Sequence, residues 1–249
     1  AGQQYFDAVI GADGINSQVR AALSGDEPRA CDRIAWRALI PDRGGLVTDA
    51  WLAVGVGLQL IASPAPDRML YWAADTPGSE MPAGSTADPR GFLRRHFGTW
   101  HHPIPQLIES TPSDALIVNR VFDRRPPRRL HAGPILLVGD AAHAMTPDLG
   151  QGACQALEDA ALLLACAARR PAAGPAELFE AFERVRLPRV RRIVRDSYAI
   201  GRMAVTPSRG AAGARDAVTR SMPESLTNRR LATYASAEAF RRQLDRAAD

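Results

Sequence analysis

The sequence predicts a mixed α/β fold in which a partial α/β domain is combined with an antiparallel sheet and C-terminal helices. Two short apolar runs, at 5–12 and 133–138, each end at a paired glycine and aspartate, as buried strands that lead into loops do. Strand-like segments separated by Gly, Pro and Asp fill residues 31–129. Helical patterns dominate from residue 151 onward. With 249 residues, 46% of them apolar, the chain is long enough to bury a core.

The first element is a predicted buried strand over residues 5–12, followed by a turn at Asp13-Gly14. The next residues have helical spacing, with Asn16 or Ser17 as the N-cap. A buried parallel strand needs neighbours on both sides, and no strand precedes this one. We therefore expect the chain to be part of a larger fold.

The middle of the chain predicts an antiparallel meander with two helical interruptions. Its strand-like runs lie at 32–41, 49–62 and 67–75, and its helical stretches lie near 89–98 and 103–110.

After the second buried strand, the pattern predicts a loop to Gly150 and then mainly helices. The expected segments are a helix at 151–168, a helical stretch at 175–204, a loop at 206–215 and a terminal helical region at 216–248. Pro188 predicts a kink or a break between two helical segments within 175–204.

Composition excludes several classes of function. The net charge is +4, but all 31 basic residues are arginine, which indicates a coding bias more than a nucleic-acid partner. Without lysine the chain has neither a Schiff-base lysine nor a P-loop. Three scattered cysteines predict no disulfide scaffold and no zinc module, and favour a reducing, cytoplasmic location. No apolar run of membrane-spanning length is present, so we expect no membrane partner.

The loop at 138–160, VGDAAHAMTPDLGQGACQALEDA, has the residues to hold a flat, hydroxyl-bearing ligand. Asp140 follows a strand, where its carboxylate can accept hydrogen bonds from ribose or ribityl hydroxyls. Gly150-Gln151-Gly152 opens a helix whose free N–H groups favour a ring that gains negative charge. Pro147 stiffens the loop and presents an apolar wall. The simpler alternative makes Asp140 a turn or helix-cap residue.

This loop resembles the second flavin-binding motif of the FAD-dependent aromatic hydroxylases, the p-hydroxybenzoate and salicylate hydroxylase-like monooxygenases. Its TPDLGQGACQALEDA wording is most similar to the FAD-dependent urate hydroxylase branch. The resemblance implies a partial FAD-binding Rossmann-like domain. It also implies cofactor contacts from Gly139, Asp140, Pro147, Gly150, Gln151 and Gly152.

A second segment, GADGINSQVR at 11–20, is similar to the DG motif of the same family. The resemblance implies that Asp13, Gly14 and Arg20 help to anchor FAD, and that the motif serves NAD(P)H use. IAWRALIP at 34–41 is similar to the family's WRG/WRA strand and implies that Arg37 lies near the substrate or the flavin; an ion-paired strand residue is the alternative. Pro147 and Arg37 are the residues expected closest to the chemistry.

The resemblance covers about residues 5–205 and divides the chain into four parts. These are 1–30 with the DG motif, 31–129 as the substrate-binding sheet, 130–168 with the GD motif, and 169–249 as a C-terminal helical region.

By resemblance, NAD(P)H reduces FAD, O₂ adds to give a flavin C4a-hydroperoxide, and oxygen is transferred to an aromatic or heteroaromatic substrate. One departure from the family is large, because GxGxxG occurs nowhere in the sequence. Three alternatives to a self-sufficient enzyme therefore stay open. The chain needs a separate GxGxxG-bearing partner, it acts as a homodimer, or it is a fragment that does not bind flavin. Epoxidation or plain oxidation is another.

Other polar residues are expected to be structural. His143 is assigned to packing of its loop, and Glu158 and Asp159 are assigned to ion pairs with arginines. His101 and His102 lack metal-ligand partners at a useful spacing, so no metal site is expected.

Overall fold

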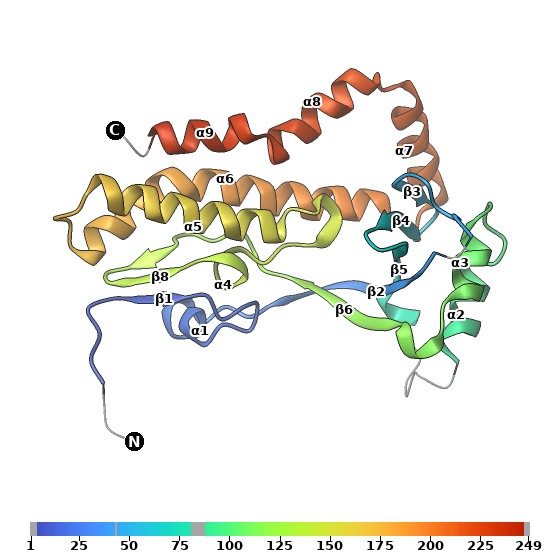
Figure 1. Ribbon diagram of the computed structural model, residues 1–249, viewed down its shortest axis with the longest axis horizontal. Helices are drawn as coiled ribbons and strands as arrows, with labels where there is room; N and C mark the ends of the chain where they lie inside the picture. The colour runs from blue at the N-terminus through green and yellow to red at the C-terminus, as the bar shows by residue number, and fades with distance from the viewer. Residues whose placement is uncertain (1–3, 43, 81–87, 247–249) are drawn as a thin grey trace. The chain divides into compact units, whose positions relative to one another are not determined.

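A computed structural model describes residues 4–42, 44–80 and 88–246 of the chain (Figure 1). It confirms the mixed α/β class, with a small sheet that contains a parallel strand pair, a larger antiparallel sheet and C-terminal helices. The chain forms two compact units. Unit 1 comprises Ala1–Arg29, Phe122–Gly201 and Ser221–Asp249, and unit 2 comprises Ala30–Val121 and Arg202–Arg220.

Unit 1 contains a three-stranded sheet of order β1-β8-β7. Strand β1 (Val9–Gly11) pairs in parallel with β8 (Ile135–Leu137), which pairs antiparallel with β7 (His131–Ala132). Because β1 and β8 are parallel, the loops that follow them leave the same edge of the sheet. The two sequence motifs are brought together in this way.

Strand β1 is less buried than its apolar sequence predicts. Val9 is 39% exposed and Ile10 is 49% exposed, whereas Gly11 is buried. The expectation of a fully buried strand is therefore wrong for the described chain. The reason is that β1 is an edge strand, paired with β8 alone among the described residues.

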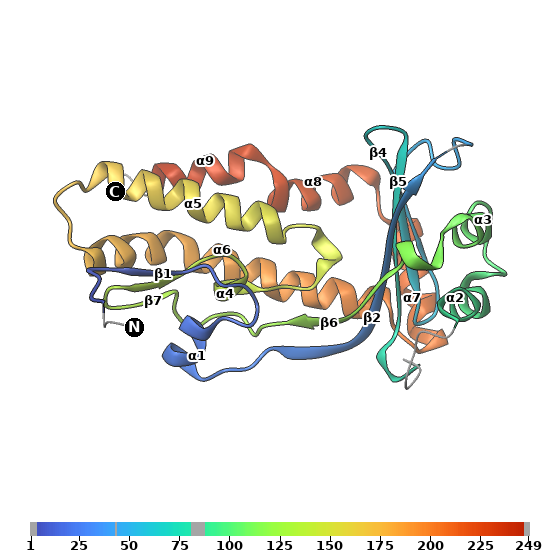
Figure 2. The same cartoon turned by 60° about the horizontal axis from the view of Figure 1, so that its bottom comes forward.

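The helices of unit 1 pack around a core that includes Leu136, Leu162, Phe182 and Val190, each 0% exposed. Figures 1 and 2 show α5 and α6 running side by side, with α9 alongside them. The helical elements are α1 (Gln18–Ser24), α4 (Gly139–His143), η3 (Pro147–Leu149), α5 (Gly152–Arg169), α6 (Pro175–Ala204), α8 (Glu224–Ala235) and α9 (Ala237–Arg246).

Helix α6 continues through Pro188, so of the kink or break expected there, the break into two segments does not occur. A proline inside a helix removes one backbone hydrogen bond. Here Phe182 before the proline and Val190 after it are both fully buried in the core of unit 1. Packing on both sides of Pro188 therefore offsets the lost bond.

Unit 2 contains a five-stranded antiparallel sheet of order β3-β4-β5-β2-β6. Helices α2 and α3 cover one of its faces (Figure 2), where side chains such as Trp36 and Trp72 pack against Phe97 and Leu107. The elements are β2 (Arg29–Pro41), β3 (Trp51–Val54), β4 (Gln59–Ala65), β5 (Met69–Pro77), η1 (Gly78–Glu80), α2 (Pro89–Phe97), α3 (Ile104–Ser110), η2 (Ser113–Ala115) and β6 (Ile117–Asp123).

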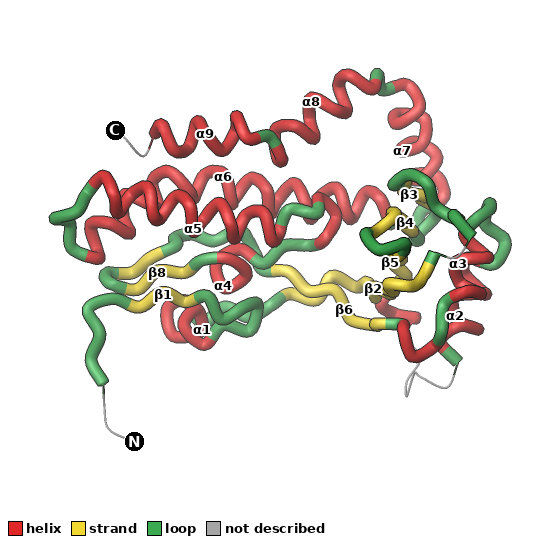
Figure 3. Tube along the Cα trace, in the orientation of Figure 1, coloured by secondary structure: helices red, strands yellow, loops and turns green. Residues whose placement is uncertain are grey.

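The loop expected at 206–215 is largely helix α7 (Arg209–Ser221), as the secondary-structure view in Figure 3 shows. Glycines in this segment favour a loop, but local capping and tertiary contacts outweigh that preference. Ser208 accepts a hydrogen bond from the N–H of Ala211, and Ala212 is buried. Arg215 donates to the carbonyl oxygens of Gly55 and Ala204.

Within the described part of the chain, no helix combines the length and the apolar character needed to cross a membrane.

Candidate functional site

A cavity of about 740 Å³ lies in unit 1, where the loops after β1 and β8 meet the start of α5. We call it the glycine-lined cavity. Seven of the predicted site residues line it: Gly14, Gly139, Asp140, Pro147, Gly150, Gln151 and Gly152. The remaining lining residues are Ala12, Val138, Met145, Thr146, Ala153, Ala156 and Ala160.

Glycine keeps this cavity open. Gly14 and Gly150 have φ angles of 78° and 62°, in the left-handed region that favours glycine. A Cβ atom placed at Gly14, Gly150 or Gly152 would meet no atom within 4 Å. A flat ligand can therefore lie directly against the backbone at these three positions.

The N-terminus of α5 faces the same cavity. Its N-cap residue, Gln151, makes no side-chain capping bond, and the first turn contains no acidic residue. The first N–H groups of a helix lack partners within the helix and carry partial positive charge. Since Gly152 and Ala153 line the cavity, this helix end favours an electron-rich or negatively charged group there.

Asp140 is the charged side chain of the glycine-lined cavity. It is exposed and has no hydrogen-bond or ion-pair partner among the described residues. Its backbone follows Gly139, whose φ angle is 57°. A carboxylate that is not used by the fold is free to accept hydrogen bonds from ligand hydroxyls.

The loop before α5 is fixed to α6. The hydroxyl of Ser197 donates to the carbonyl oxygen of Thr146 at 2.7 Å. The Asp148 carboxylate lies so close to Gly201 that a Cβ there would stand 2.1 Å from it. These contacts hold Pro147 in place at the edge of the cavity.

The buried carboxylate of Asp159, on α5, fixes the turn after β8. It accepts hydrogen bonds from the Gly139 N–H at 2.7 Å, from His143 Nε2 at 2.7 Å and from Arg186 Nε at 2.6 Å. Burial acts to raise the pKa of Asp159, but the hydrogen bond from His143 and the charges of His143 and Arg186 hold it below its usual value. The structural assignments of His143 and Asp159 are confirmed.

Arg186 completes this network. It is fully buried and donates to Glu158, to the backbone and side-chain oxygens of Gln155, and to Gln243 of α9. Arg189 makes a second ion pair with Glu158 at 2.9 Å, which confirms the pairing expected for that residue. The sequence did not single out Arg186 or Arg189, because arginine recurs throughout this helix without a local motif.

Asp13 is used by the fold. Its carboxylate accepts hydrogen bonds from the N–H groups of Gln18 at 2.7 Å and Val19 at 3.3 Å, at the start of α1. A hydrogen bond from the Ser17 side chain is the largest of the effects that lower the pKa of Asp13. Ser17 is also the N-cap, since its hydroxyl oxygen accepts from the Arg20 N–H at 2.9 Å. Asp13 does not line the glycine-lined cavity.

Arg20 is likewise committed to internal contacts. It is 4% exposed and forms a two-point contact with Asp26, through Nε at 2.8 Å and Nη2 at 2.6 Å. Its Nη1 donates to the carbonyl oxygens of Ala141 and Ala142 in α4. The Arg20 hydrogen bond is the largest effect that lowers the pKa of Asp26 to about 2. Arg20 thus joins the first loop to the second.

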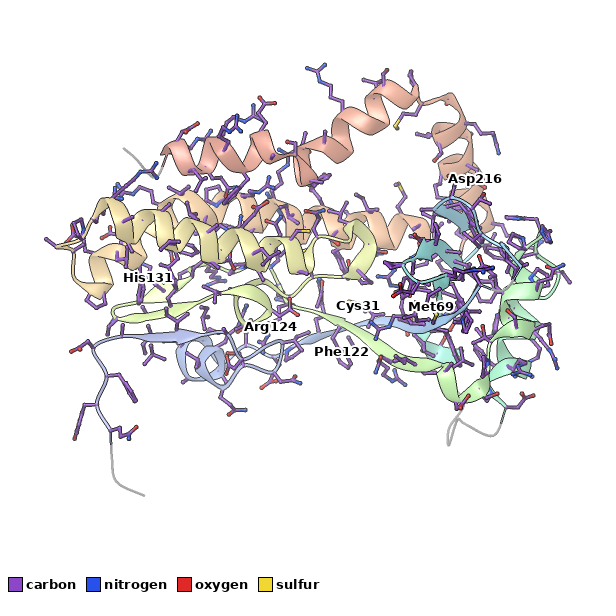
Figure 4. All side chains as sticks on the ribbon, in the orientation of Figure 1. Cys31, Met69, Phe122, Arg124, His131 and Asp216 are labelled. Carbon is purple, nitrogen blue, oxygen red and sulfur yellow. The ribbon has the colours of Figure 1, made fainter. Side chains whose placement is uncertain are left out.

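Arg124, labelled in Figure 4, is a further clamp that the sequence did not reveal. It is 2% exposed and donates to the carbonyl oxygens of Ile15, at 2.9 and 2.6 Å, and of Asp26, at 2.6 Å. Its partners lie 98 and 109 residues away in the sequence, so no local signal was available.

Arg37 belongs to unit 2 and does not line the glycine-lined cavity. It lies on the face of β2 opposite the buried Trp36, and its Nη2 donates to Asn119 Oδ1 at 2.6 Å. Its Nε is buried without a hydrogen-bond partner among the described residues. Asp75, also on this face, pairs with Arg33 at 3.0 Å and accepts from Gln59.

No group of three or more His, Cys, Asp or Glu residues in the described ranges is arranged to hold a metal ion.

Comparison with known proteins gives concordant matches. Residues 120–197 match the model of a FAD binding domain family. The chain is 36% identical over 231 residues to an aurachin C monooxygenase/isomerase from Stigmatella aurantiaca, covering 90% of this chain and 58% of the relative. It is 34% identical over 164 residues to a FAD-dependent urate hydroxylase from Klebsiella pneumoniae, covering 63% of this chain and 42% of the relative.

Among solved structures, an HpxO variant from Klebsiella pneumoniae complexed with FAD matches with a TM-score of 0.80 and 28% identity. The match covers 91% of this chain and 60% of that chain. The chain thus spans about half the length of the curated relatives that it matches.

Proposed function

The chain belongs to the FAD-dependent aromatic hydroxylase family, and from this premise we propose that it supplies part of a FAD-dependent monooxygenase acting on an aromatic or heteroaromatic ring. The observation that carries the proposal is the glycine-lined cavity, where an unpartnered carboxylate, open glycines and a helix N-terminus come together. NAD(P)H as reductant and O₂ as oxygen donor belong to the same proposal.

The residues present fit a flavin. Asp140 would accept hydrogen bonds from the ribityl hydroxyls, and the open backbone at Gly150 and Gly152 would hold the ring. A Cβ atom at Gly14, in the first loop, would meet no atom within 4 Å, so this backbone would also leave room for the ligand. A flavin held by these residues would supply the chemistry of hydride acceptance and O₂ activation.

The chain's own residues bind, orient and exclude water. The N–H groups at the start of α5 favour negative charge on the adjacent ring edge. Pro147 offers no N–H donor and forms an apolar wall, held in place through Thr146 and Ser197. The carboxylate of Asp159 holds the Gly139 N–H and so keeps Asp140 oriented.

Three predicted residues, Asp13, Arg20 and Arg37, do not line the glycine-lined cavity. Asp13 and Arg20 act by positioning the first loop, since their polar atoms are used by α1, Asp26 and α4. Arg37 is proposed as a substrate contact on its face of the antiparallel sheet, because its buried Nε has no partner within the described chain.

We extend the proposal to a partner. The chain lacks GxGxxG, and unit 1 exposes apolar side chains on β1 and α5, including Ile10 at 49%, Leu157 at 73% and Leu164 at 71%. Apolar side chains left on an edge strand and a helix face are typical of a surface that another segment covers. A GxGxxG-bearing segment, in the same polypeptide or in another, is the proposed occupant, and a second copy of the chain is the alternative.

The test is the visible absorbance of bound flavin. The chain, alone and together with a GxGxxG-bearing segment from a relative, is mixed with FAD and desalted. Retained flavin in either sample, followed by NAD(P)H oxidation that an aromatic compound stimulates and an oxygenated product, supports the proposal. A colourless protein in both samples contradicts it, and stimulated oxidation without oxygenated product indicates an oxidase. Gel filtration distinguishes the partner from a second copy of the chain. If the chain is a dimer but stays colourless without the GxGxxG-bearing segment, the result supports that segment as the partner.

A further inference from the structure

A second cavity in unit 1, of about 450 Å³, is lined by arginines and lies outside the site described above. We call it the arginine-lined cavity. It is formed by the end of α1 and the segment that leads to β7. Its lining residues are Arg20, Leu23, Ser24, Asp26, Arg125, Pro126, Pro127, Arg128, Arg129, Leu130, His131 and Leu137.

The two cavities lie on opposite sides of one strand. Leu137, the last residue of β8, lines the arginine-lined cavity, and Val138 lines the glycine-lined cavity. Val138 has extended backbone angles, φ −137° and ψ 162°, and successive side chains of an extended chain point to opposite faces. A ligand in the arginine-lined cavity is therefore separated by the sheet from a ring held at Asp140.

The charge of the arginine-lined cavity is not neutralised. Asp26 is its carboxylate, and that group is already shared by Arg20 and Arg124. Arg125, Arg128 and Arg129 are exposed and have no ion-pair or hydrogen-bond partner among the described residues. Three unpaired guanidinium groups around one cavity favour a multiply charged anion, and guanidinium matches phosphate in geometry and charge.

The arginine-bearing segment is held in place. The N–H of Arg124 donates to the carbonyl oxygen of Ala144 at 2.9 Å. The Glu183 carboxylate accepts from the N–H groups of Leu130 and His131. Between these anchors, Pro126 and Pro127 restrict the backbone. A restricted segment loses less conformational entropy when it binds a ligand.

His131, labelled in Figure 4, supplies an independent sign of a missing partner. Its Nδ1 is buried and makes no hydrogen bond within the described chain. Buried polar atoms in folded proteins are normally satisfied, so an orphaned one next to a cavity indicates a ligand or ordered water. Nδ1 can donate to a phosphate oxygen in the protonated ring or in one tautomer of the neutral ring.

We propose that the arginine-lined cavity binds the phosphate groups of a nucleotide, held by Arg125, Arg128 and Arg129. The cavity size and the fixed segment favour a small phosphorylated ligand over a nucleic-acid backbone. The inference rests on the proposed function only in that the nucleotide would belong to the nicotinamide dinucleotide reductant. Two sources share this chemistry, the 2′-phosphate of NADPH and the pyrophosphate of a nicotinamide dinucleotide.

The experiment measures binding of adenosine 2′,5′-bisphosphate and of ADP to the 249-residue chain by calorimetry at low salt. The test variant is Arg128→Gln with Arg129→Gln. The matched control is Arg241→Gln with Arg246→Gln, which removes the same charge from exposed positions of α9 that do not line the cavity. We expect at least about tenfold weaker binding in the test variant and less than about twofold change in the control, because charge-assisted hydrogen bonds are lost only in the former.

The ligands separate the two sources. Tighter binding of adenosine 2′,5′-bisphosphate than of ADP assigns the site to the 2′-phosphate, and the reverse order assigns it to the pyrophosphate. Equal losses in the test and control variants, or no binding of either nucleotide at millimolar concentration, would overturn the proposal. The proposal would also be overturned if a DNA duplex bound more tightly than both nucleotides and this binding were lost in the test variant. None of these readouts needs flavin or turnover, so failure here is distinguishable from failure of the proposed function.

Discussion

The loops that follow β1 and β8 each contain a glycine and an aspartate, but the fold uses the two aspartates differently. In the first loop, Asp13 accepts hydrogen bonds from the N–H groups at the start of α1. In the second loop, Asp140 lines the glycine-lined cavity without a partner among the described residues. The comparison teaches that a motif residue can be used by the fold, and that the unpartnered one is the better candidate for a ligand contact.

The largest expected effect concerns the clamp that supports the first loop. Arg20→Met removes the partner of Asp26 and leaves the carbonyl oxygens of Ala141 and Ala142 without a donor. The free energy of unfolding, measured by urea denaturation, should fall by about 3 kcal/mol. Arg94→Met, which breaks the exposed ion pair with Glu109, is the matched control and should cost much less. If Arg20→Met weakens flavin retention without loss of stability, Arg20 is a direct cofactor contact and the comparison fails.

A smaller effect is expected at the glycine that opens the second loop. Gly150→Ala places a side chain at a φ angle of 62° and should lower stability by about 1–2 kcal/mol. The added methyl group meets no protein atom within 4 Å, so it projects into open space. Flavin affinity should therefore fall beyond what the stability loss explains. Unchanged affinity would show that the ring does not approach this backbone.

The N-cap of α1 should contribute less to the free energy of unfolding than the preceding two features. Ser17→Ala removes the acceptor for the Arg20 N–H and should lower the free energy of unfolding by about 1 kcal/mol. Its effect on flavin retention should follow stability alone. If Ser17→Ala lowers flavin retention more than an equally destabilising variant elsewhere does, Ser17 is part of the flavin site.

Acid should weaken the ion pair between Arg20 and Asp26 that supports the first loop. The pKa of Asp26 is lowered from 3.8 to about 2 in the folded chain, so its stabilising contribution is present above about pH 4 and is lost as the pH falls toward 2. The stability difference between the wild type and Asp26→Asn should shrink over that window. A difference that stays constant from pH 5 to about pH 2 would contradict the ion-pair account.

The sequence predicted which residues of the second loop lie together, because its motif is local. Gly139, Asp140, Pro147, Gly150, Gln151 and Gly152 are close in the chain, and all of them line one cavity. The start of α1 was also predictable, since its cap and its first turn are neighbours in the sequence. Contacts between residues that are close in the sequence can be predicted from their spacing, without knowledge of the tertiary structure.

Contacts across the sequence were not predictable. Arg20 reaches carbonyl oxygens more than 120 residues away, and the partner of Asp159 on α6 is 27 residues away. Helix α7 was missed because its glycines favour a loop, whereas Arg215 and the burial of Ala212 stabilise the helix. The exposure of Val9 and Ile10 was missed because an apolar run does not reveal which neighbours a strand has.

The most direct test of the account compares Asp140→Ala with the wild type, each assembled with the GxGxxG-bearing segment where flavin retention requires it. Because Asp140 has no partner in the described chain, its removal should change the free energy of unfolding by less than about 0.5 kcal/mol. The dissociation constant for FAD, measured by flavin fluorescence, should rise at least about tenfold, because the hydrogen bonds to the ligand hydroxyls are lost. An unchanged dissociation constant at unchanged stability would contradict the assignment of the glycine-lined cavity as the flavin site.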